Sequence, residues 1–154
     1  MSVFSMATNK ILQNKEKTIK KDDFLKNQKK EEIVQGKSIE FNRKVLEKGN
    51  ASMLILSHTD KKDKLKQRDS GLNQVLCKIA KEKGITLAID LNELMKTPDK
   101  KEKSLILARM IQNMRLIKKY NNKFKLLNFR NKPQAFSFLL TLGADTQTAK
   151  KALE

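Results

Sequence analysis

The sequence predicts an α/β fold: an incomplete or open, TIM-like β/α barrel in which a parallel sheet of about five β-α units is flanked by helices. Short apolar runs alternate along the chain with helical patterns, at roughly 30 residues per unit. The most apolar runs are continuous, which is typical of parallel strands buried on both faces. The chain has 154 residues, whereas a closed eight-unit barrel usually needs about 250, so we expect an incomplete barrel.

The chain is expected to form a single domain whose first 31 residues are only weakly patterned. Residues 1–31 are a weakly patterned N-terminal β-α segment, with a short strand expected at residues 3–7 and a polar stretch at residues 10–30. Residues 32–154 carry the clear alternation and are expected to form the β/α domain itself.

Each expected strand is a short apolar run bounded by polar or turn-forming residues. The run MLIL at residues 53–56 is the clearest and predicts a strand buried on both faces. The expected strands are residues 33–35, 53–56, 86–91 and 124–127. A polar loop over residues 58–68 separates the second of them from the next helix.

Capping residues mark the first two helices of the domain. Ser38 is expected to cap a helix that Gly49 ends, because a serine oxygen accepts a free N–H at a helix start and glycine adopts the left-handed conformation at its end. Asp69 and Ser70 are expected to cap the next helix, in which apolar residues recur at helical spacing up to Gly84.

The longest helix is expected to begin with Thr97 as the cap and Pro98 in the first turn, and to run to about Tyr120. Its core stripe is Leu107, Met110, Ile111, Met114 and Ile117. The opposite face carries Arg109, Gln112, Arg115 and Lys119. A helical ridge of this kind can follow an RNA backbone, and an ordinary solvated face is the alternative interpretation.

Two further helices are expected at the C-terminal end. Pro133 favours the first turn of a helix, because the proline N–H would have no partner there. That helix is expected to reach residue 140 and to end near Gly143. Asp145 or Thr146 is expected to cap a last short helix that ends at Leu153.

The charge distribution favours an anionic partner. The 34 Lys and Arg residues outnumber the 17 Asp and Glu residues, and the net charge is +17. No acidic residue lies between Glu102 and Asp145. That stretch contains Lys103, Arg109, Arg115, Lys118, Lys119, Lys123, Lys125, Arg130 and Lys132. Nucleic acid is favoured over a membrane surface, because no strongly apolar amphipathic face accompanies the charge.

Composition excludes several classes of protein. Cys77 is the only cysteine and His58 the only histidine, so neither a disulfide framework nor a multi-histidine metal site is expected. No apolar run approaches the roughly 18 residues of a membrane span. The start does not have the pattern of a signal peptide. These observations predict a cytoplasmic protein that contacts no membrane and binds no cofactor or metal itself.

One segment resembles a known family. Residues 68–80, RDSGLNQVLCKIA, resemble the signature of the archaeal ribonuclease P protein component 3 family. The preceding LILSH at residues 54–58 and the following LAIDLNEL at residues 87–94 resemble the strands that flank that signature. The similarity extends over residues 32–154. Two departures are that about two N-terminal β-α units of the family are missing, and that Gln74 stands where many members carry His.

The resemblance implies a function. Members of this family are similar to incomplete barrels of the polymerase and histidinol phosphatase superfamily. They are protein subunits of ribonuclease P, which removes the 5′ leader from precursor tRNA. The resemblance implies that the RNA, with magnesium, carries out the cleavage and that this chain is itself non-catalytic. It implies contact with the ribonuclease P RNA, with protein component 2 and the other protein components, and indirectly with precursor tRNA.

The candidate RNA-contact residues are basic side chains on the long helix and at the expected barrel rim: Arg68, Arg109, Arg115, Lys119, Arg130 and Lys132. Two other functions stay open, a stand-alone metal-dependent phosphoesterase of the same superfamily and a generic basic RNA-binding protein. A phosphoesterase centre gathers several histidines and carboxylates. Here the expected strand ends supply His58, Asp69, Asp90 and little else, and His58 is expected to be a hydrogen-bonded neighbour of the rim.

Overall fold

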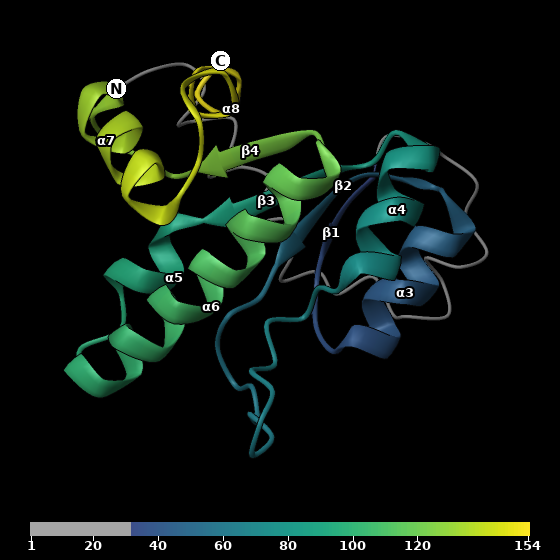
Figure 1. Ribbon diagram of the computed structural model, residues 1–154, viewed down its shortest axis with the longest axis horizontal. Helices are drawn as coiled ribbons and strands as arrows, with labels where there is room; N and C mark the ends of the chain where they lie inside the picture. The colour runs from purple at the N-terminus through teal and green to yellow at the C-terminus, as the bar shows by residue number, and fades with distance from the viewer. Residues whose placement is uncertain (1–31) are drawn as a thin grey trace.

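The computed structural model describes residues 32–154, so the strand expected at residues 3–7 and the polar stretch at residues 10–30 lie outside the described residues. A single parallel sheet has the order β1-β2-β3-β4 (Figure 1). Its strands are β1 (Glu32–Gln35), β2 (Ala51–Leu56), β3 (Thr86–Asp90) and β4 (Phe124–Leu127). The predicted α/β class and parallel sheet are confirmed. Over the described residues, the sheet has four strands and is not closed.

Helices connect the strands, as parallel pairing requires. The helices are α3 (Ile39–Lys48), α4 (Gln74–Lys83), α5 (Leu91–Met95), α6 (Lys100–Tyr120), α7 (Lys132–Leu142) and α8 (Thr146–Ala152). In Figure 1, α3 and α4 lie beside each other at one side of the molecule, and α7 and α8 lie near β4 at the other. None of the helices in residues 32–154 is both long and apolar enough to cross a membrane.

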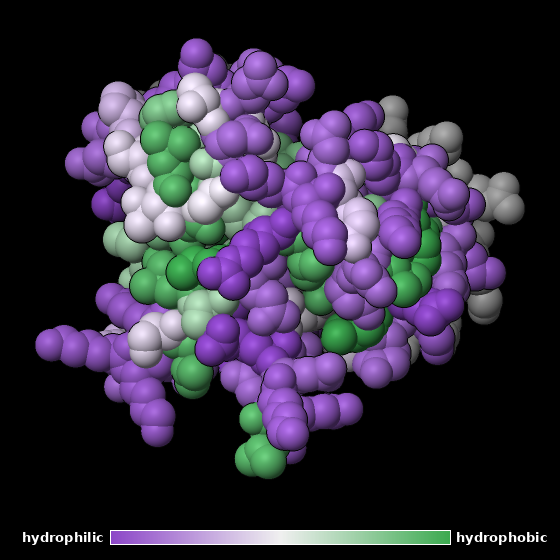
Figure 2. Space-filling view, viewed as in Figure 1, coloured by the Kyte–Doolittle hydropathy of each residue, from purple (hydrophilic) through white to green (hydrophobic). Residues whose placement is uncertain are grey.

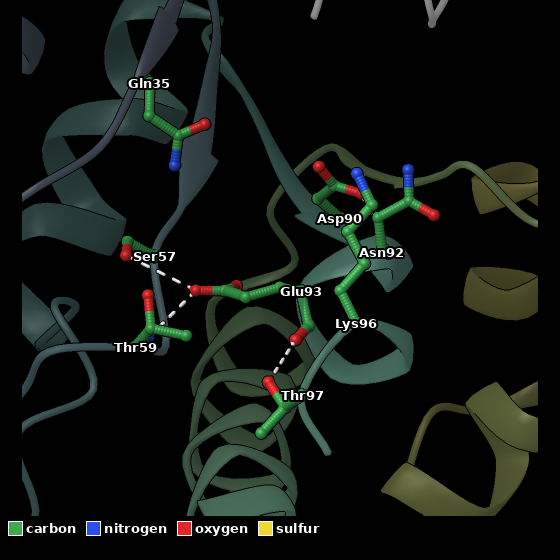
Figure 3. Close-up of a pocket in the computed structure, with 8 residues that line it drawn as sticks. All are labelled: Gln35, Ser57, Thr59, Asp90, Asn92, Glu93, Lys96 and Thr97. Atoms are coloured by element: carbon green, nitrogen blue, oxygen red, sulfur yellow. Dashed lines mark hydrogen bonds between the residues drawn. The ribbon is translucent and has the colours of Figure 1, made fainter.

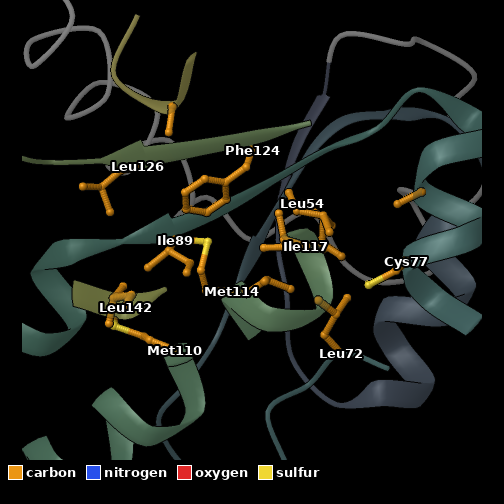
Figure 4. Close-up of a cluster of buried hydrophobic side chains, with 14 of the residues drawn as sticks. Leu54, Leu72, Cys77, Ile89, Met110, Met114, Ile117, Phe124, Leu126 and Leu142 are labelled. Atoms are coloured by element: carbon orange, nitrogen blue, oxygen red, sulfur yellow. The ribbon is translucent and has the colours of Figure 1, made fainter. Parts of the chain in front are cut away.

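The main core lies between one face of the sheet and the helices. Alternate strand residues point to this face, and the register places Leu54 beside Leu87 and Ile89 beside Leu126. Met110 and Met114 of α6 pack against them and are fully buried (Figure 4). The strand sequences are continuously apolar because both faces of the sheet are covered by other residues.

The second face of the sheet has a smaller apolar cluster. Its buried members are Ile55, Ala88 and Leu127, with the partly buried Ile33 and Met53 packed against them. At the carboxyl ends of the strands this face becomes polar. Gln35 and Asp90 stand there at the last positions of β1 and β3. The carboxyl edge of the sheet is the usual place for functional groups in β/α folds.

Several helix ends confirm the expected caps. The Ser38 hydroxyl accepts a hydrogen bond from the Phe41 N–H at 3.2 Å, and Gly49 ends α3 in the left-handed conformation with φ 67°. Asp145 caps α8, with its carboxylate accepting from the Thr148 N–H at 2.7 Å. Pro133 lies in the first turn of α7, as expected.

The start predicted for the second helix is wrong. Helix α4 begins at Gln74 and its cap is Asn73, whose side chain accepts from the Leu76 N–H at 2.9 Å. Asp69 and Ser70 lie upstream in the loop, where the Asp69 carboxylate accepts from the Gly71 N–H at 3.1 Å. Gly71 has φ 77°, which is incompatible with a right-handed helix, so no helix can start at Ser70.

The start predicted for the long helix is also wrong. Helix α6 begins at Lys100 with Asp99 as its cap. The Thr97 hydroxyl instead donates to the Glu93 carbonyl at 2.8 Å, and so completes the end of α5, a helix that was not expected. Asp99 outcompetes Thr97 as a cap because a carboxylate adds a favourable charge at the helix start.

Gly36 lets β1 turn closely against β2. Its N–H donates to the Ile55 carbonyl at 2.7 Å, and a Cβ at this position would lie 2.6 Å from that carbonyl oxygen. We expect Gly36→Ala to lower the free energy of unfolding by about 2–3 kcal/mol in denaturant titration, because the clash is with backbone. Gly84→Ala is the control. Its Cβ would meet nothing within 4 Å, so only left-handed backbone strain of about 1 kcal/mol remains. Equal losses in the two variants would contradict this account.

Candidate nucleic-acid interface

A buried histidine lies just beyond the carboxyl end of β2. His58 is fully buried. Its Nδ1 lies 3.0 Å from Oε2 of Glu93, and its Nε2 lies 2.9 Å from the side-chain nitrogen of Asn113. A carboxylate only accepts and an amide NH₂ group only donates, so this arrangement places the Nδ1 proton toward Glu93 and lets Nε2 accept from Asn113. His58 is thus a hydrogen-bonded residue at the carboxyl edge of the sheet, as expected from its position in the sequence.

Glu93 links this segment to α5. Its Oε1 accepts from the backbone N–H groups of His58 at 2.7 Å and of Thr59 at 2.9 Å. Burial alone would raise the pKa of Glu93, but the contacts with His58 and Thr59 outweigh burial and lower the pKa below its ordinary value. The carboxylate therefore stays ionised at neutral pH and fixes the direction in which the chain leaves β2.

The structure corrects the placement of Arg109. We expected Arg109 on the solvent face of the long helix, but it is 2% exposed. The buried arc of α6 consists of Ile106, Arg109, Met110, Asn113, Met114 and Ile117. The expected stripe included Leu107 and Ile111, which are only partly buried, and was therefore rotated away from this arc.

The Arg109 guanidinium forms hydrogen bonds with the loop that follows β2. It donates to the carbonyl oxygens of His58 at 2.9 Å and Lys61 at 3.2 Å, and it lies 3.4 Å from a carboxylate oxygen of Asp63. A planar, permanently charged group suits this task, because it satisfies several fixed acceptors at once. The positive charge of Arg109 therefore lies inside the protein and does not face solvent.

The other five predicted RNA-contact residues are exposed: Arg68, Arg115, Lys119, Arg130 and Lys132. Arg68 is held near α6, since its carbonyl accepts from the Gln112 side chain at 3.1 Å. Arg115 and Lys119 share the outer side of α6. Arg130 and Lys132 lie beyond the carboxyl end of β4, at the start of α7. The structure therefore gives two basic areas, one on α6 and one after β4.

A pocket of about 400 Å³ lies at the carboxyl edge of β1, β2 and β3 (Figure 3). Its lining residues are Gln35, Ser57, Thr59, Asp90, Asn92, Glu93, Lys96 and Thr97. The Asp90 carboxylate accepts from the Asn92 N–H at 2.9 Å and from the Asn128 side chain at 2.7 Å. Within residues 32–154, no three His, Cys, Asp or Glu side chains are grouped so that they could hold a metal ion.

Sequence reasoning missed the polar network behind the loop. Asn113 donates to the carbonyl of Ser70 at 3.0 Å as well as to His58, and the buried Asn42 donates to the carbonyl of Gly71 at 2.8 Å. The one available signal was the spacing of Arg109 and Asn113. They are four residues apart, so they share a helix face with the methionines of the core.

The fold is similar to a solved structure. A chain in the cryo-EM structure of archaeal ribonuclease P with mature tRNA superposes with a TM-score of 0.63 and 22% sequence identity. The match covers 78% of the present chain and 52% of that chain, so this sequence spans about half the length of that neighbour. No protein-family model and no curated protein matches the sequence. The similarity shows a shared fold.

Proposed function

We propose that this chain is a protein subunit of ribonuclease P, of the component 3 type, which binds the RNA and a partner protein and leaves cleavage of precursor tRNA to the RNA with magnesium. The observation that supports this most is the fold, which is shared with a chain of an archaeal ribonuclease P complex. The RDSGLNQVLCKIA segment supports the same assignment. We further propose that the sheet is the preserved arc of an open β/α barrel.

The charge supports RNA as the main ligand. The chain carries a net charge of +17, and Arg115 and Lys119 lie exposed on α6. Lysines and arginines on such a surface contact phosphates and release counterions, which provides affinity without sequence specificity. Aromatic residues make up 5% of the chain and none is Trp. Stacking of single-stranded bases is therefore a smaller contribution than contact with the backbone of folded RNA.

The contact set excludes Arg109, whose guanidinium is engaged inside the protein. The proposed phosphate contacts are Arg68, Arg115, Lys119, Arg130 and Lys132. In this proposal the buried network of His58, Glu93 and Asn113 is structural, because it holds the segment from which Arg68 projects.

Salt dependence of RNA binding tests this contact set. If each of the five side chains neutralises one phosphate, the logarithm of the association constant should fall with the logarithm of salt concentration at a slope of about −4. The double variant Arg115→Gln/Lys119→Gln should reduce this slope by about 1–2 units. The measurement is a filter-binding titration with ribonuclease P RNA over a salt series.

A matched double variant separates local contact from general charge. Lys48→Gln/Lys83→Gln removes the same charge from exposed residues at the C-terminal ends of α3 and α4. We expect this variant to keep the slope of the unmodified protein. An equal reduction of the slope in both variants would contradict the proposed contact set and favour a generic basic RNA-binding protein.

A further inference from the structure

We propose that the loop of residues 59–69, here called the projecting loop, is itself an RNA-binding element that places Leu65 against folded RNA between flanking lysines. The inference rests on the proposed function and adds an element to it. The loop extends away from the body of the molecule at the lower edge of Figure 1. In Figure 2 the same projection is hydrophilic along its length and apolar at its end.

Leu65 is 101% exposed and stands at the tip of the loop. Removing an apolar side chain from water is favourable, and in the free chain Leu65 has none of this burial. Its sequence neighbours Lys64 and Lys66 are exposed as well. An apolar tip between two cations suits a ligand that offers an apolar surface beside anionic groups.

The loop carries more cations than acids. It contains five cations: Lys61, Lys62, Lys64, Lys66 and Arg68. It has three acids, Asp60, Asp63 and Asp69, and the last two accept hydrogen bonds at its base. Asp63 accepts from the Asp69 N–H at 2.8 Å and lies beside Arg109, and Asp69 accepts from the Gly71 N–H. Near the tip, Lys64 and Lys66 are exposed on either side of Leu65, so the tip favours an anionic partner.

The loop is held in shape before any partner binds. At its tip, the backbone N–H of Lys64 donates to the Gln67 carbonyl at 2.8 Å, and the backbone N–H of Gln67 donates to the Lys64 carbonyl at 3.2 Å. Its base is fixed by Arg109 and by the bond from the Gln112 side chain to the Arg68 carbonyl. A loop that is already ordered loses little conformational entropy on binding, so its contacts contribute more fully to affinity.

Folded RNA fits these features. The minor groove of an RNA helix is wide and shallow and exposes ribose and base edges between two phosphate backbones. Proteins that bind the minor groove of DNA insert apolar side chains such as leucine between base steps, so an exposed leucine can contact nucleic-acid bases directly. The geometry thus points to Leu65 on a ribose or base surface, with Lys64 and Lys66 near the phosphates on either side.

A tethered cleavage reagent tests the placement. The variant Leu65→Cys is labelled with an iron–EDTA reagent, bound to ribonuclease P RNA, and activated with ascorbate and peroxide. Cys77 does not interfere, because it is fully buried and burial raises the pKa of its thiol to about 12. We expect RNA strand cuts in one short region. Unsubstituted protein taken through the labelling should give none, and Lys48→Cys should not cut that region.

The variant Leu65→Ser tests the energetic part. We expect it to weaken RNA binding about 3- to 10-fold, as loss of one buried apolar contact predicts, and Leu65→Met to restore most of the affinity. The thermal unfolding midpoint should not change, because the side chain is fully exposed.

The outcomes separate this inference from the proposed function. If the unmodified protein binds the RNA with the expected salt slope but Leu65→Cys gives no cuts, the projecting loop is not an RNA-binding element and the proposed function survives. If Leu65→Ser weakens binding of a protein component and leaves RNA affinity unchanged, the loop contacts protein and the inference is overturned. If the unmodified protein does not bind the RNA at all, both proposals fail.

Discussion

Arg109→Leu is expected to lower the free energy of unfolding by about 3 kcal/mol. The substitution leaves the carbonyl oxygens of His58 and Lys61 without their donor and Asp63 without its cation. Removing one partner from a buried charged network is costly, because the remaining polar groups stay desolvated. The measurement is equilibrium denaturation, combined with hydrogen exchange of the Lys64 and Gln67 amides, which should accelerate when the loop loses its base.

Two variants control for charge and for helix effects. Arg115→Leu removes a cation from the exposed side of the same helix and should change the free energy of unfolding by no more than about 0.5 kcal/mol. Arg109→Lys keeps the charge but cannot reproduce a planar fork of donors, so it should rescue only part of the loss. A loss at Arg109 no larger than that at Arg115 would show that the buried contacts are unimportant.

Glu93→Gln is expected to destabilise the protein by about 2–3 kcal/mol at neutral pH. The carboxylate accepts from two backbone N–H groups and from His58, and an amide carries no charge and can present its NH₂ group to a donor. The pKa of Glu93 is lower in the folded protein than in the unfolded chain. Its stabilising effect is therefore complete above the unfolded-state pKa of about 4.3 and is lost as the pH falls through the folded-state value.

Denaturation at several pH values tests this linkage. The difference in the free energy of unfolding between the unmodified protein and Glu93→Gln should be largest near neutral pH and shrink below about pH 4. Glu47→Gln is a suitable control, since Glu47 forms an exposed pair with Arg43 within α3 and such pairs contribute little. A difference that grows on acidification would have the wrong sign for this account.

The fold was largely predictable because its determinants are local. Continuous apolar runs gave β2 and β3, and Ser38, Gly49 and Asp145 each act within a few residues of the helix ends that they mark. The errors occurred where two local signals competed. Ser70 is a good cap by residue type, but Asn73 serves α4 because Gly71 turns the backbone between them.

The candidate site was less predictable because its contacts are far apart in the sequence. His58 meets Asn113 across 55 residues, and Arg109 meets the His58 carbonyl across 51 residues. Periodicity alone treats an arginine as a surface residue, since charged side chains are seldom buried without partners. The partners of Arg109 are mostly backbone carbonyls, which no pattern of side chains reveals.

The most direct measurement of the central claim is reconstitution. Precursor tRNA is incubated with ribonuclease P RNA and the other protein components, with and without this chain, over a series of magnesium concentrations. We predict that omission of the chain lowers the rate of 5′-leader removal, most strongly at low magnesium, and that Arg115→Gln/Lys119→Gln restores the rate only in part. Cleavage that is unchanged by omission at every magnesium concentration would contradict the proposed function.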